Sequence, residues 1–127
     1  MSKILFVDDD EKILHVVGTM LESEGHEVMT ADSGRKCLDL LENEKPDLIL
    51  MDIMMPEMDG WEVVKKIRKD KSNKDIVISM LTINATEMGK AKSLEVADWH
   101  IRKPISKENL LNAVDWLLKK NNFRPIS

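Results

Sequence analysis

Short apolar runs that end in acidic residues constrain this chain more than any other feature. Residues 4–7 (Ile-Leu-Phe-Val) lead into Asp8 and Asp9. Residues 48–51 (Leu-Ile-Leu-Met) lead into Asp52. Continuous apolar runs of this length, separated by helical patterns, are typical of buried parallel strands. Because parallel strands end at the same edge of a sheet, we expect these three carboxylates to converge there.

Two further apolar runs deliver polar residues to the same predicted edge. Residues 76–81 lead into Thr82, and the segment around 100–102 leads into Lys103 and Pro104. Three carboxylates, a hydroxyl and an ammonium group at one edge are not the pattern of a hydrophobic core. They indicate a binding or reaction site.

Strands and helices alternate along the whole chain. We expect strands at residues 3–7, 27–31, 47–51, 75–81 and 98–102. Helices are predicted after a cap at Asp9 or Asp10, after Ser33, after the loop 56–60, weakly near 85–95, and after Ser106. This order predicts an α/β fold, a doubly wound five-stranded parallel sheet of (βα)5 type with right-handed crossovers. We assign residues 1–122 to one domain and 123–127 to a C-terminal tail.

Helical spacing predicts which side chains point inward. The expected inward residues are Ile13, Val16, Val17, Met20 and Leu21 in the first helix, Val63, Val64 and Ile67 in the third, and Leu110, Ala113, Val114, Leu117 and Leu118 in the last. Trp61 and Trp116 are expected on helix surfaces. The Asp59-Gly60 pair is interpreted as a turn.

Composition excludes several classes of function. The chain has 19 Lys and Arg against 23 Asp and Glu, a net charge of −4, and no basic block that would bind nucleic acid. The single cysteine, Cys37, cannot form an internal disulfide and suits a reducing compartment. No signal peptide and no apolar stretch near the roughly 20 residues of a membrane span is evident. We therefore expect a cytoplasmic protein without a membrane contact.

Four short blocks resemble the receiver domain of two-component response regulators. Residues 47–60 (DLILMDIMMPEMDG) resemble the signature of that family. Residues 7–10, 80–82 and 102–104 resemble its other three blocks, in the same order. The resemblance covers residues 3 to about 120. It implies a chemotaxis-regulator-like protein with the flavodoxin-like strand order 2-1-3-4-5.

The resemblance assigns a role in signalling to each residue at the predicted edge. Asp52 is the expected phosphoacceptor, which receives its phosphoryl group from a sensor histidine kinase or a histidine phosphotransfer protein. Thr82 is the switch hydroxyl and Lys103 is the pocket lysine. The protein is expected to act as a switch in a phosphorelay rather than as an enzyme, either as a monomer or as a weak dimer through the helix 4–strand 5–helix 5 face.

A metal ion is expected beside the phosphoacceptor. Three carboxylates close together repel one another, so a positive charge must hold them ionised. Mg²⁺ prefers oxygen ligands and shares its remaining positions with phosphate. We expect Asp8, Asp9 and Asp52 to form the site, and the resemblance adds the backbone carbonyl of Met54.

The chain departs from the family pattern near the predicted fifth strand. His100 occupies a position, three residues before Lys103, where the family usually has Tyr or Phe. It is either a polar edge residue or, like Thr82, a switch residue. Val96 stands where a glycine is common, and the spacing from Thr82 to Lys103 is one residue shorter than usual.

Two other functions remain as alternatives. A phosphohydrolase of the haloacid-dehalogenase type also forms an aspartyl phosphate, but it needs its nucleophile on the first strand in an Asp-x-Asp-x-Thr/Val run, which residues 8–12 (DDDEK) lack. A pseudo-receiver is an interaction module that never meets phosphate. The presence of Asp52, Thr82 and Lys103 together argues against this second alternative.

Overall fold

The computed structural model describes residues 2–82, 97–102 and 106–122 of the 127-residue chain. The elements are β1 (Lys3–Val7), α1 (Glu11–Ser23), β2 (Glu27–Ala31), α2 (Gly34–Leu41), β3 (Leu48–Asp52), α3 (Gly60–Lys69), a 3-10 turn η1 (Lys71–Asn73), β4 (Val77–Thr82), β5 (Trp99–Arg102) and α5 (Lys107–Asn122). The helix expected near residues 85–95 lies outside the described residues. None of the described helices is both long and apolar enough to cross a membrane.

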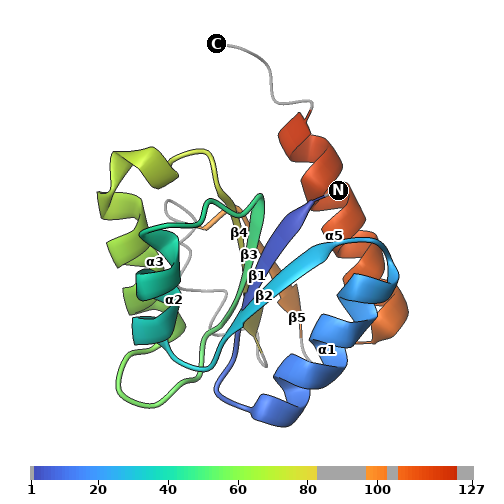
Figure 1. Ribbon diagram of the computed structural model, residues 1–127, viewed down its shortest axis with the longest axis horizontal. Helices are drawn as coiled ribbons and strands as arrows, with labels where there is room; N and C mark the ends of the chain where they lie inside the picture. Colours follow the sequence, from blue (N-terminus) through green and yellow to red (C-terminus); the bar gives the residue numbers. More distant parts are fainter. Residues whose placement is uncertain (1, 83–96, 103–105, 123–127) are drawn as a thin grey trace.

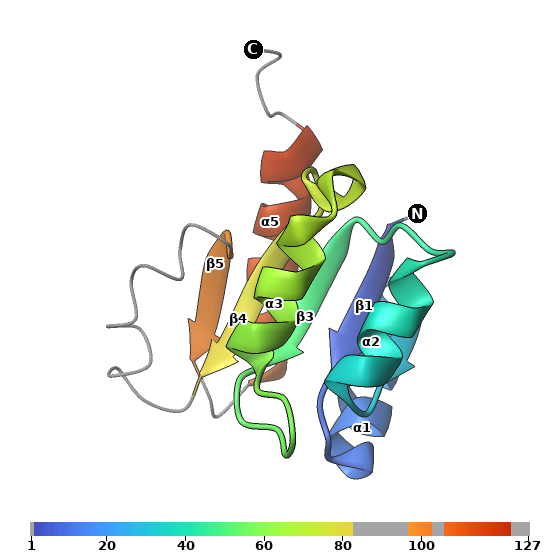
Figure 2. The same ribbon diagram turned by 90° about the vertical axis from the view of Figure 1, so that its left-hand side faces the viewer.

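The five strands form one parallel sheet in the order β2-β1-β3-β4-β5, which confirms the predicted topology. Helices α1 and α5 lie on one face of the sheet, and α2 and α3 lie on the other (Figure 1). Seen from the side, the strand arrows all point to the same end of the molecule (Figure 2). The predicted doubly wound α/β fold is therefore present.

The central strands are buried on both faces, which explains their continuous apolar sequences. All five residues of β3 are buried. Alternate side chains of this strand enter different cores: Ile49 and Met51 pack towards α2 and α3, whereas Leu48 and Leu50 pack towards α1 and α5. Burial of one such side chain contributes roughly 1.5–3 kcal/mol to folding. The site therefore lies at the end of a strand that is buried along its whole length.

Three helices begin at the predicted cap residues. Asp10 caps α1, and its Oδ1 accepts hydrogen bonds from the amides of Lys12 at 2.9 Å and Ile13 at 3.3 Å. Ser33 and Ser106 cap α2 and α5 in the same way, through their hydroxyl oxygens. Short polar side chains here satisfy amides that have no partner within the helix.

The predicted inward face of α1 is confirmed for Val17 and Leu21, which are buried, and for Ile13 and Met20, which are partly buried against the core; the prediction for Val16 was wrong. Val16 is 56% exposed, and the buried residues are Leu14, Val17, Gly18 and Leu21. The buried residues have i, i+3, i+4 and i+7 spacing and form one stripe, and Val16 falls outside it. Gly18 lies on this buried stripe and faces β2, where a β-carbon would lie at an ordinary distance of 3.8 Å from Cγ1 of Val28.

Two interpretations of the α3 region were also wrong. Trp61 is only 8% exposed and belongs to the core between the sheet and α2 and α3, because it lies one helical turn before the inward Val64. Asp59 is the cap of α3 rather than a simple turn residue, since its Oδ1 accepts a hydrogen bond from the amide of Glu62 at 3.0 Å. The predictions for Val63, Val64 and Ile67 are confirmed.

Candidate functional site

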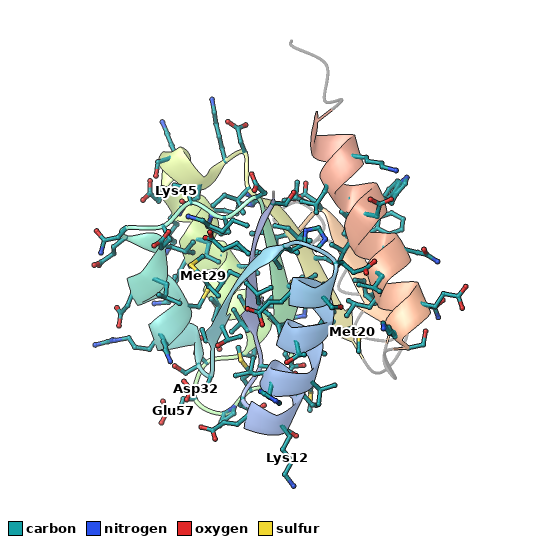
Figure 3. All side chains as sticks on the ribbon, turned by 45° about the vertical axis from the view of Figure 1, so that its right-hand side comes forward. Lys12, Met20, Met29, Asp32, Lys45 and Glu57 are labelled. Carbon is teal, nitrogen blue, oxygen red and sulfur yellow. The ribbon has the colours of Figure 1, made fainter. Side chains whose placement is uncertain are left out.

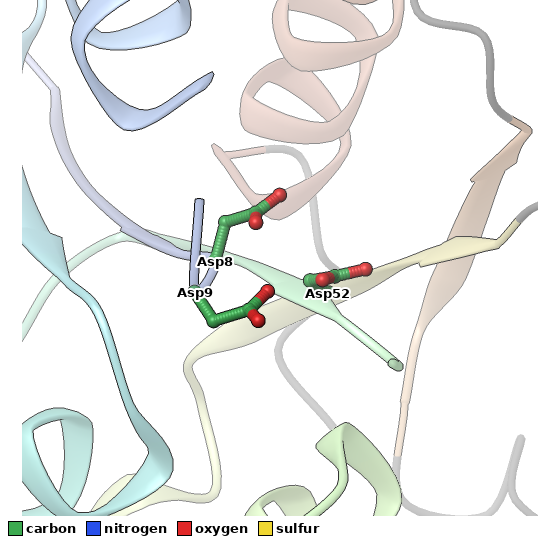
Figure 4. A group of neighbouring side chains, drawn as sticks. All are labelled: Asp8, Asp9 and Asp52. Atoms are coloured by element: carbon green, nitrogen blue, oxygen red, sulfur yellow. The ribbon is translucent and has the colours of Figure 1, made fainter. Parts of the chain in front are cut away.

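Three carboxylates meet at the edge of the sheet where the strands end. Asp8 and Asp9 follow β1, and Asp52 is the last residue of β3. One ligand atom from each carboxylate lies within 4.8 Å of the other two, and Figure 4 shows the three side chains gathered between the two strand ends. Asp8 and Asp52 are 1% and 4% exposed, whereas Asp9 is exposed to solvent. The predicted acidic cluster is therefore present, with an open side at Asp9.

The end of β1 holds Asp8 by hydrogen bonds on both sides. Its amide donates to the carbonyl of Ala31 in β2 at 3.1 Å. Its Oδ1 accepts a hydrogen bond from the amide of Asp10 at 2.9 Å. Because Asp10 also caps α1, the chain passes from strand to helix within three residues and leaves the Asp9 side chain facing the cluster.

The end of β3 is held by the chain that follows it. Asp52 pairs with Leu81 of β4, and the amide of Ile53 donates to the Leu81 carbonyl at 3.4 Å. The amide of Gly60 returns to donate to the carbonyl of Ile53 at 2.9 Å. A β-carbon at Gly60 would overlap the Asp52 carbonyl oxygen and lie 2.9 Å from Cα of Ile53. Only glycine permits this approach, so Gly60 fixes the backbone of Asp52.

The loop between β3 and α3 contains a tight turn. The amide of Met58 donates to the carbonyl of Pro56 at 2.7 Å, and Glu57 between them has a φ of 69°. This backbone conformation is uncommon for a residue with a side chain. Met54, two residues past Asp52, is 60% exposed. In Figure 3, Glu57 and Asp32 lie towards one end of the molecule, and Lys45 lies towards the opposite end.

Of the remaining predicted site residues, Thr82 lies at the same edge of the sheet. Thr82 is the last residue of β4, the neighbour of β3, and it pairs with Arg102 of β5. Lys103 lies outside the described residues. His100 lies in β5, is half-buried, and its ring stacks on that of Trp99 with centroids 5.6 Å apart and an angle of 10° between the planes. The backbone therefore brings Thr82 to the predicted edge.

One ion pair that supports β5 was not predicted. Arg68 Nη2 of α3 lies 3.0 Å from Oδ2 of Asp98, which also accepts a hydrogen bond from the amide of Ile78 at 2.9 Å. The pair therefore joins α3, β4 and the residue before β5. The partners are 30 residues apart in sequence, so no local pattern could have revealed it.

Two other features of the molecule are separate from the acidic cluster. A groove of about 460 Å³ lies between α1 and β2 and is lined by residues including His15, Glu22 and Thr30, without any of the three clustered aspartates.

Cys37 is fully buried, and burial raises the pKa of its thiol to about 12. This thiol is therefore neutral near pH 7 and cannot act as a nucleophile.

The cluster has the donors for a hard cation and a nucleophile. Oxygen ligands from three carboxylates suit a small divalent ion such as Mg²⁺. A carboxylate such as that of Asp52 can also attack a phosphoryl group. The donor set therefore fits the predicted metal ion and the predicted phosphoacceptor at one place.

Comparison with known proteins identifies the family. The model of the response regulator receiver domain family matches residues 4–115 of this chain. The chain therefore belongs to the receiver domains of two-component response regulators, as the sequence blocks predicted.

Curated relatives are longer proteins. The chain is 40% identical over 123 residues to the alkaline phosphatase synthesis transcriptional regulatory protein PhoP of Bacillus subtilis, an alignment that covers 96% of this chain and 50% of PhoP. It is 37% identical over 122 residues to the probable transcriptional regulator ycf27 of Guillardia theta, covering 95% of this chain and 47% of that protein. The chain thus spans about half the length of these curated relatives.

Solved structures show the same fold. The chemotaxis protein CheY4 of Vibrio cholerae matches with a TM-score of 0.86 and 35% identity, covering 92% of this chain and 98% of CheY4. The receiver domain of a histidine kinase from Syntrophus aciditrophicus matches with a TM-score of 0.86 and 29% identity, covering 100% of this chain and 96% of that one.

Proposed function

We propose that this receiver domain accepts a phosphoryl group on Asp52 in a Mg²⁺-dependent reaction and changes conformation in response. The observation that carries the proposal is the convergence of Asp8, Asp9 and Asp52 at the end of the sheet. The proposed donor is the phosphohistidine of a sensor histidine kinase or of a histidine phosphotransfer protein.

The transfer step uses Asp52 as the nucleophile. One carboxylate oxygen of Asp52 attacks the phosphorus atom and forms a new P–O bond. The bond between phosphorus and the imidazole nitrogen breaks, and the nitrogen keeps the electron pair. The product is an acyl phosphate on Asp52. The fixed position of Asp52 supports this role. Asp52 is the last residue of a fully buried strand, and the backbone beside it contacts Leu81 and Gly60.

We propose that Mg²⁺ is held by Asp9, Asp52 and the backbone carbonyl of Met54, with Asp8 acting through a water molecule. When bound, the ion neutralises charge on the phosphoryl oxygens. The burial of Asp8 and Asp52 supports the assignment, because two carboxylates in a buried cluster need a positive charge to remain ionised together. The exposed Asp9 leaves a side through which the ion and the phosphate can enter.

Thr82, Lys103 and His100 are proposed to couple the phosphoryl group to the rest of the fold. The Thr82 hydroxyl donates a hydrogen bond to a phosphoryl oxygen, and the Lys103 ammonium group neutralises its charge. The pairing of Thr82 with Arg102 supports a path from the site to β5. His100 lies two residues earlier in β5 and is the second switch residue in this proposal.

The domain is proposed to be a switch and not an enzyme that turns over a substrate. The acidic cluster argues against the phosphate-independent alternative, since an interaction module has no need of three converging carboxylates at a strand edge. The net charge of −4 argues that the domain itself does not bind nucleic acid. Signalling would therefore run through protein contacts of a monomer or a weak dimer.

Incubation with acetyl phosphate tests the proposed function. Intact-protein mass spectrometry should show one phosphoryl group per chain in the presence of Mg²⁺ and none in the presence of EDTA. The adduct should be stable in acid and lost in base, as expected of an acyl phosphate. Equal labelling with and without Mg²⁺, or no labelling under any condition, would contradict the proposal.

A further inference from the structure

We propose that the free edge of β2, together with the groove between β2 and α1, binds an extended basic segment of a partner protein, which adds to the sheet as a further strand. The site is separate from the proposed function, because it involves neither Asp52 nor a phosphoryl group. Three observations carry the proposal: an unpaired strand edge, a groove lined by the same residues, and the charges around that groove.

Strand β2 has hydrogen-bonding groups on its outer side. It is the end member of the sheet, with β1 on one side and no described strand on the other. The amide of Glu27 and the carbonyl of Ala31 form hydrogen bonds on the β1 side, at 2.8 and 3.1 Å. Because the backbone groups of a strand alternate between its two edges, those of Val28 and Thr30 point outward. Within the part of the chain that the structure describes, no backbone hydrogen bond satisfies these outward groups.

The same two residues, Val28 and Thr30, line the groove of about 460 Å³ between β2 and α1. Figure 1 shows this helix lying alongside the strand. The base of the groove is apolar and includes the buried Leu14 and Gly18 and the half-buried Val28. Side chains of neighbouring strands share the faces of a sheet, so alternate side chains of a peptide added to β2 would enter this groove.

Carboxylates around the groove favour a basic peptide. Glu11 is the first residue of α1, and Glu22 lies about 16 Å further along the helix axis. Asp32 follows β2 directly, and all three carboxylates are exposed and line the groove. They outnumber the cation in the lining, Lys36. Lysine and arginine side chains of a peptide can lay their apolar stems on the base of the groove and place their charges beside these carboxylates.

A second copy of this chain fits the β2 edge poorly. The chain has a net charge of −4, and two β2 strands side by side would bring the carboxylates of both grooves together. A partner segment with Lys or Arg at alternate positions has the opposite charge. Protection of the Val28 and Thr30 amides that rises with protein concentration, without any peptide, would overturn this choice of occupant.

The first test uses a peptide of sequence Ala-Lys-Val-Lys-Val-Lys-Ala with blocked ends. Its binding to the full chain, followed by amide NMR shifts, should saturate below about 1 mM. At about ten times the dissociation constant, hydrogen exchange of the Val28 and Thr30 amides should slow by about tenfold. The same peptide with Glu in place of Lys should not bind. Unchanged exchange at Val28 and Thr30 would overturn strand addition.

The second test separates backbone pairing from attraction between charges. Two versions of the basic peptide are N-methylated at alternate residues, so that one loses the amides that face β2 and the other loses those that face solvent. The first should bind about tenfold more weakly, and the second should bind nearly as the unmodified peptide does. Equal affinities of the two versions would mean that charge alone attracts the peptide, which would overturn the proposal.

The third test changes the protein. Thr30→Pro removes an outward amide but no hydrogen bond to β1, because proline is tolerated at a sheet edge. It should weaken peptide binding by about tenfold, whereas Thr30→Val, which keeps the amide, should bind as the parent does. Circular dichroism checks that both variants are folded.

Charge reversal gives a second comparison that does not depend on proline. Glu22→Lys changes a residue that lines the groove and should weaken binding by about threefold. Asp39→Lys makes the same change in net charge at an exposed position of α2 and should have little effect. Equal weakening by the two would overturn the groove as the binding site. Acetyl phosphate labelling of the same variants reports the proposed function independently.

Discussion

The Cα atom of Gly60 lies against the carbonyl group of Asp52, with no room for a side chain between them. A β-carbon at residue 60 would overlap the Asp52 carbonyl oxygen and would lie 3.1 Å from its carbonyl carbon. The amide of Gly60 also donates a hydrogen bond to Ile53 at 2.9 Å. The first residue of α3 is thus in contact with the last residue of β3, and the position of the proposed phosphoacceptor depends on it.

Gly60→Ala should therefore destabilise the domain by about 2 kcal/mol, because the overlap falls on backbone atoms that cannot move aside. The free energy of unfolding by urea measures the effect. Gly18→Ala is the control, since its β-carbon would meet Val28 at an ordinary 3.8 Å inside a helix. That change should be neutral or stabilising by about 0.5–1 kcal/mol. If both substitutions changed the free energy of unfolding equally, the close contact at Gly60 would not contribute to stability.

Glu57→Gly should stabilise the domain by about 0.5–1 kcal/mol. Glu57 has a φ of 69°, which costs a residue with a side chain roughly 1–2 kcal/mol and costs glycine nothing. Glu62→Gly is the matched control in the first turn of α3, where loss of helix propensity should destabilise by about 1 kcal/mol. Thermal unfolding of both variants gives the comparison. Destabilisation by Glu57→Gly would contradict a strained backbone at this position.

Alkaline pH should destabilise the domain partly through Cys37. Burial raises the pKa of its thiol from 9.0 to about 12. Between these values the unfolded chain releases a proton that the folded chain keeps, so stability falls as pH rises above 9. The loss is at most about 1.4 kcal/mol per pH unit. Urea unfolding at pH 8 to 10.5 should show a smaller loss in Cys37→Ala than in the parent; parallel curves would contradict the prediction.

Removing one charge from the acidic cluster should stabilise the domain in the absence of metal. Asp52→Asn relieves repulsion among three carboxylates whose ligand atoms lie within 4.8 Å. We expect a gain of about 1 kcal/mol in EDTA. Mg²⁺ at about 100 times its dissociation constant should stabilise the parent by about 2.7 kcal/mol and should have little effect on Asp9→Asn.

Asp10→Asn is the control for this metal test, since asparagine caps a helix as well as aspartate does. It should respond to Mg²⁺ as the parent does. A full response to Mg²⁺ in Asp9→Asn would exclude Asp9 as a ligand.

The fold and the acidic cluster could be predicted together, because both follow from buried parallel strands that end at one edge of the sheet. Runs such as residues 48–51 are apolar throughout only when both faces of a strand are covered. Parallel strands then deliver the residues that follow them to one edge. Asp8, Asp9 and Asp52 could be placed together without any knowledge of side-chain contacts, since their position depends only on chain direction.

Other features could not be predicted because they depend on tertiary contacts. The apolar pattern of α1 included Val16, which is exposed, and overlooked Gly18, which has no side chain to indicate that it lies on the buried face. The pair of Arg68 and Asp98 joins residues far apart in sequence. Burial of Trp61 was visible in principle, because its spacing from Val64 is helical, but a large aromatic side chain also suits a helix surface.

Localisation of the phosphoryl group tests the central claim most directly. After reaction with acetyl phosphate and Mg²⁺, borohydride reduction converts an aspartyl phosphate into homoserine, which mass spectrometry of peptides can assign to one residue. We predict a single modified residue, Asp52, and no modification in Asp52→Asn. Modification of Asp8 or Asp9 instead, or acid-stable label that persists in Asp52→Asn, would contradict the assignment of Asp52 as the phosphoacceptor.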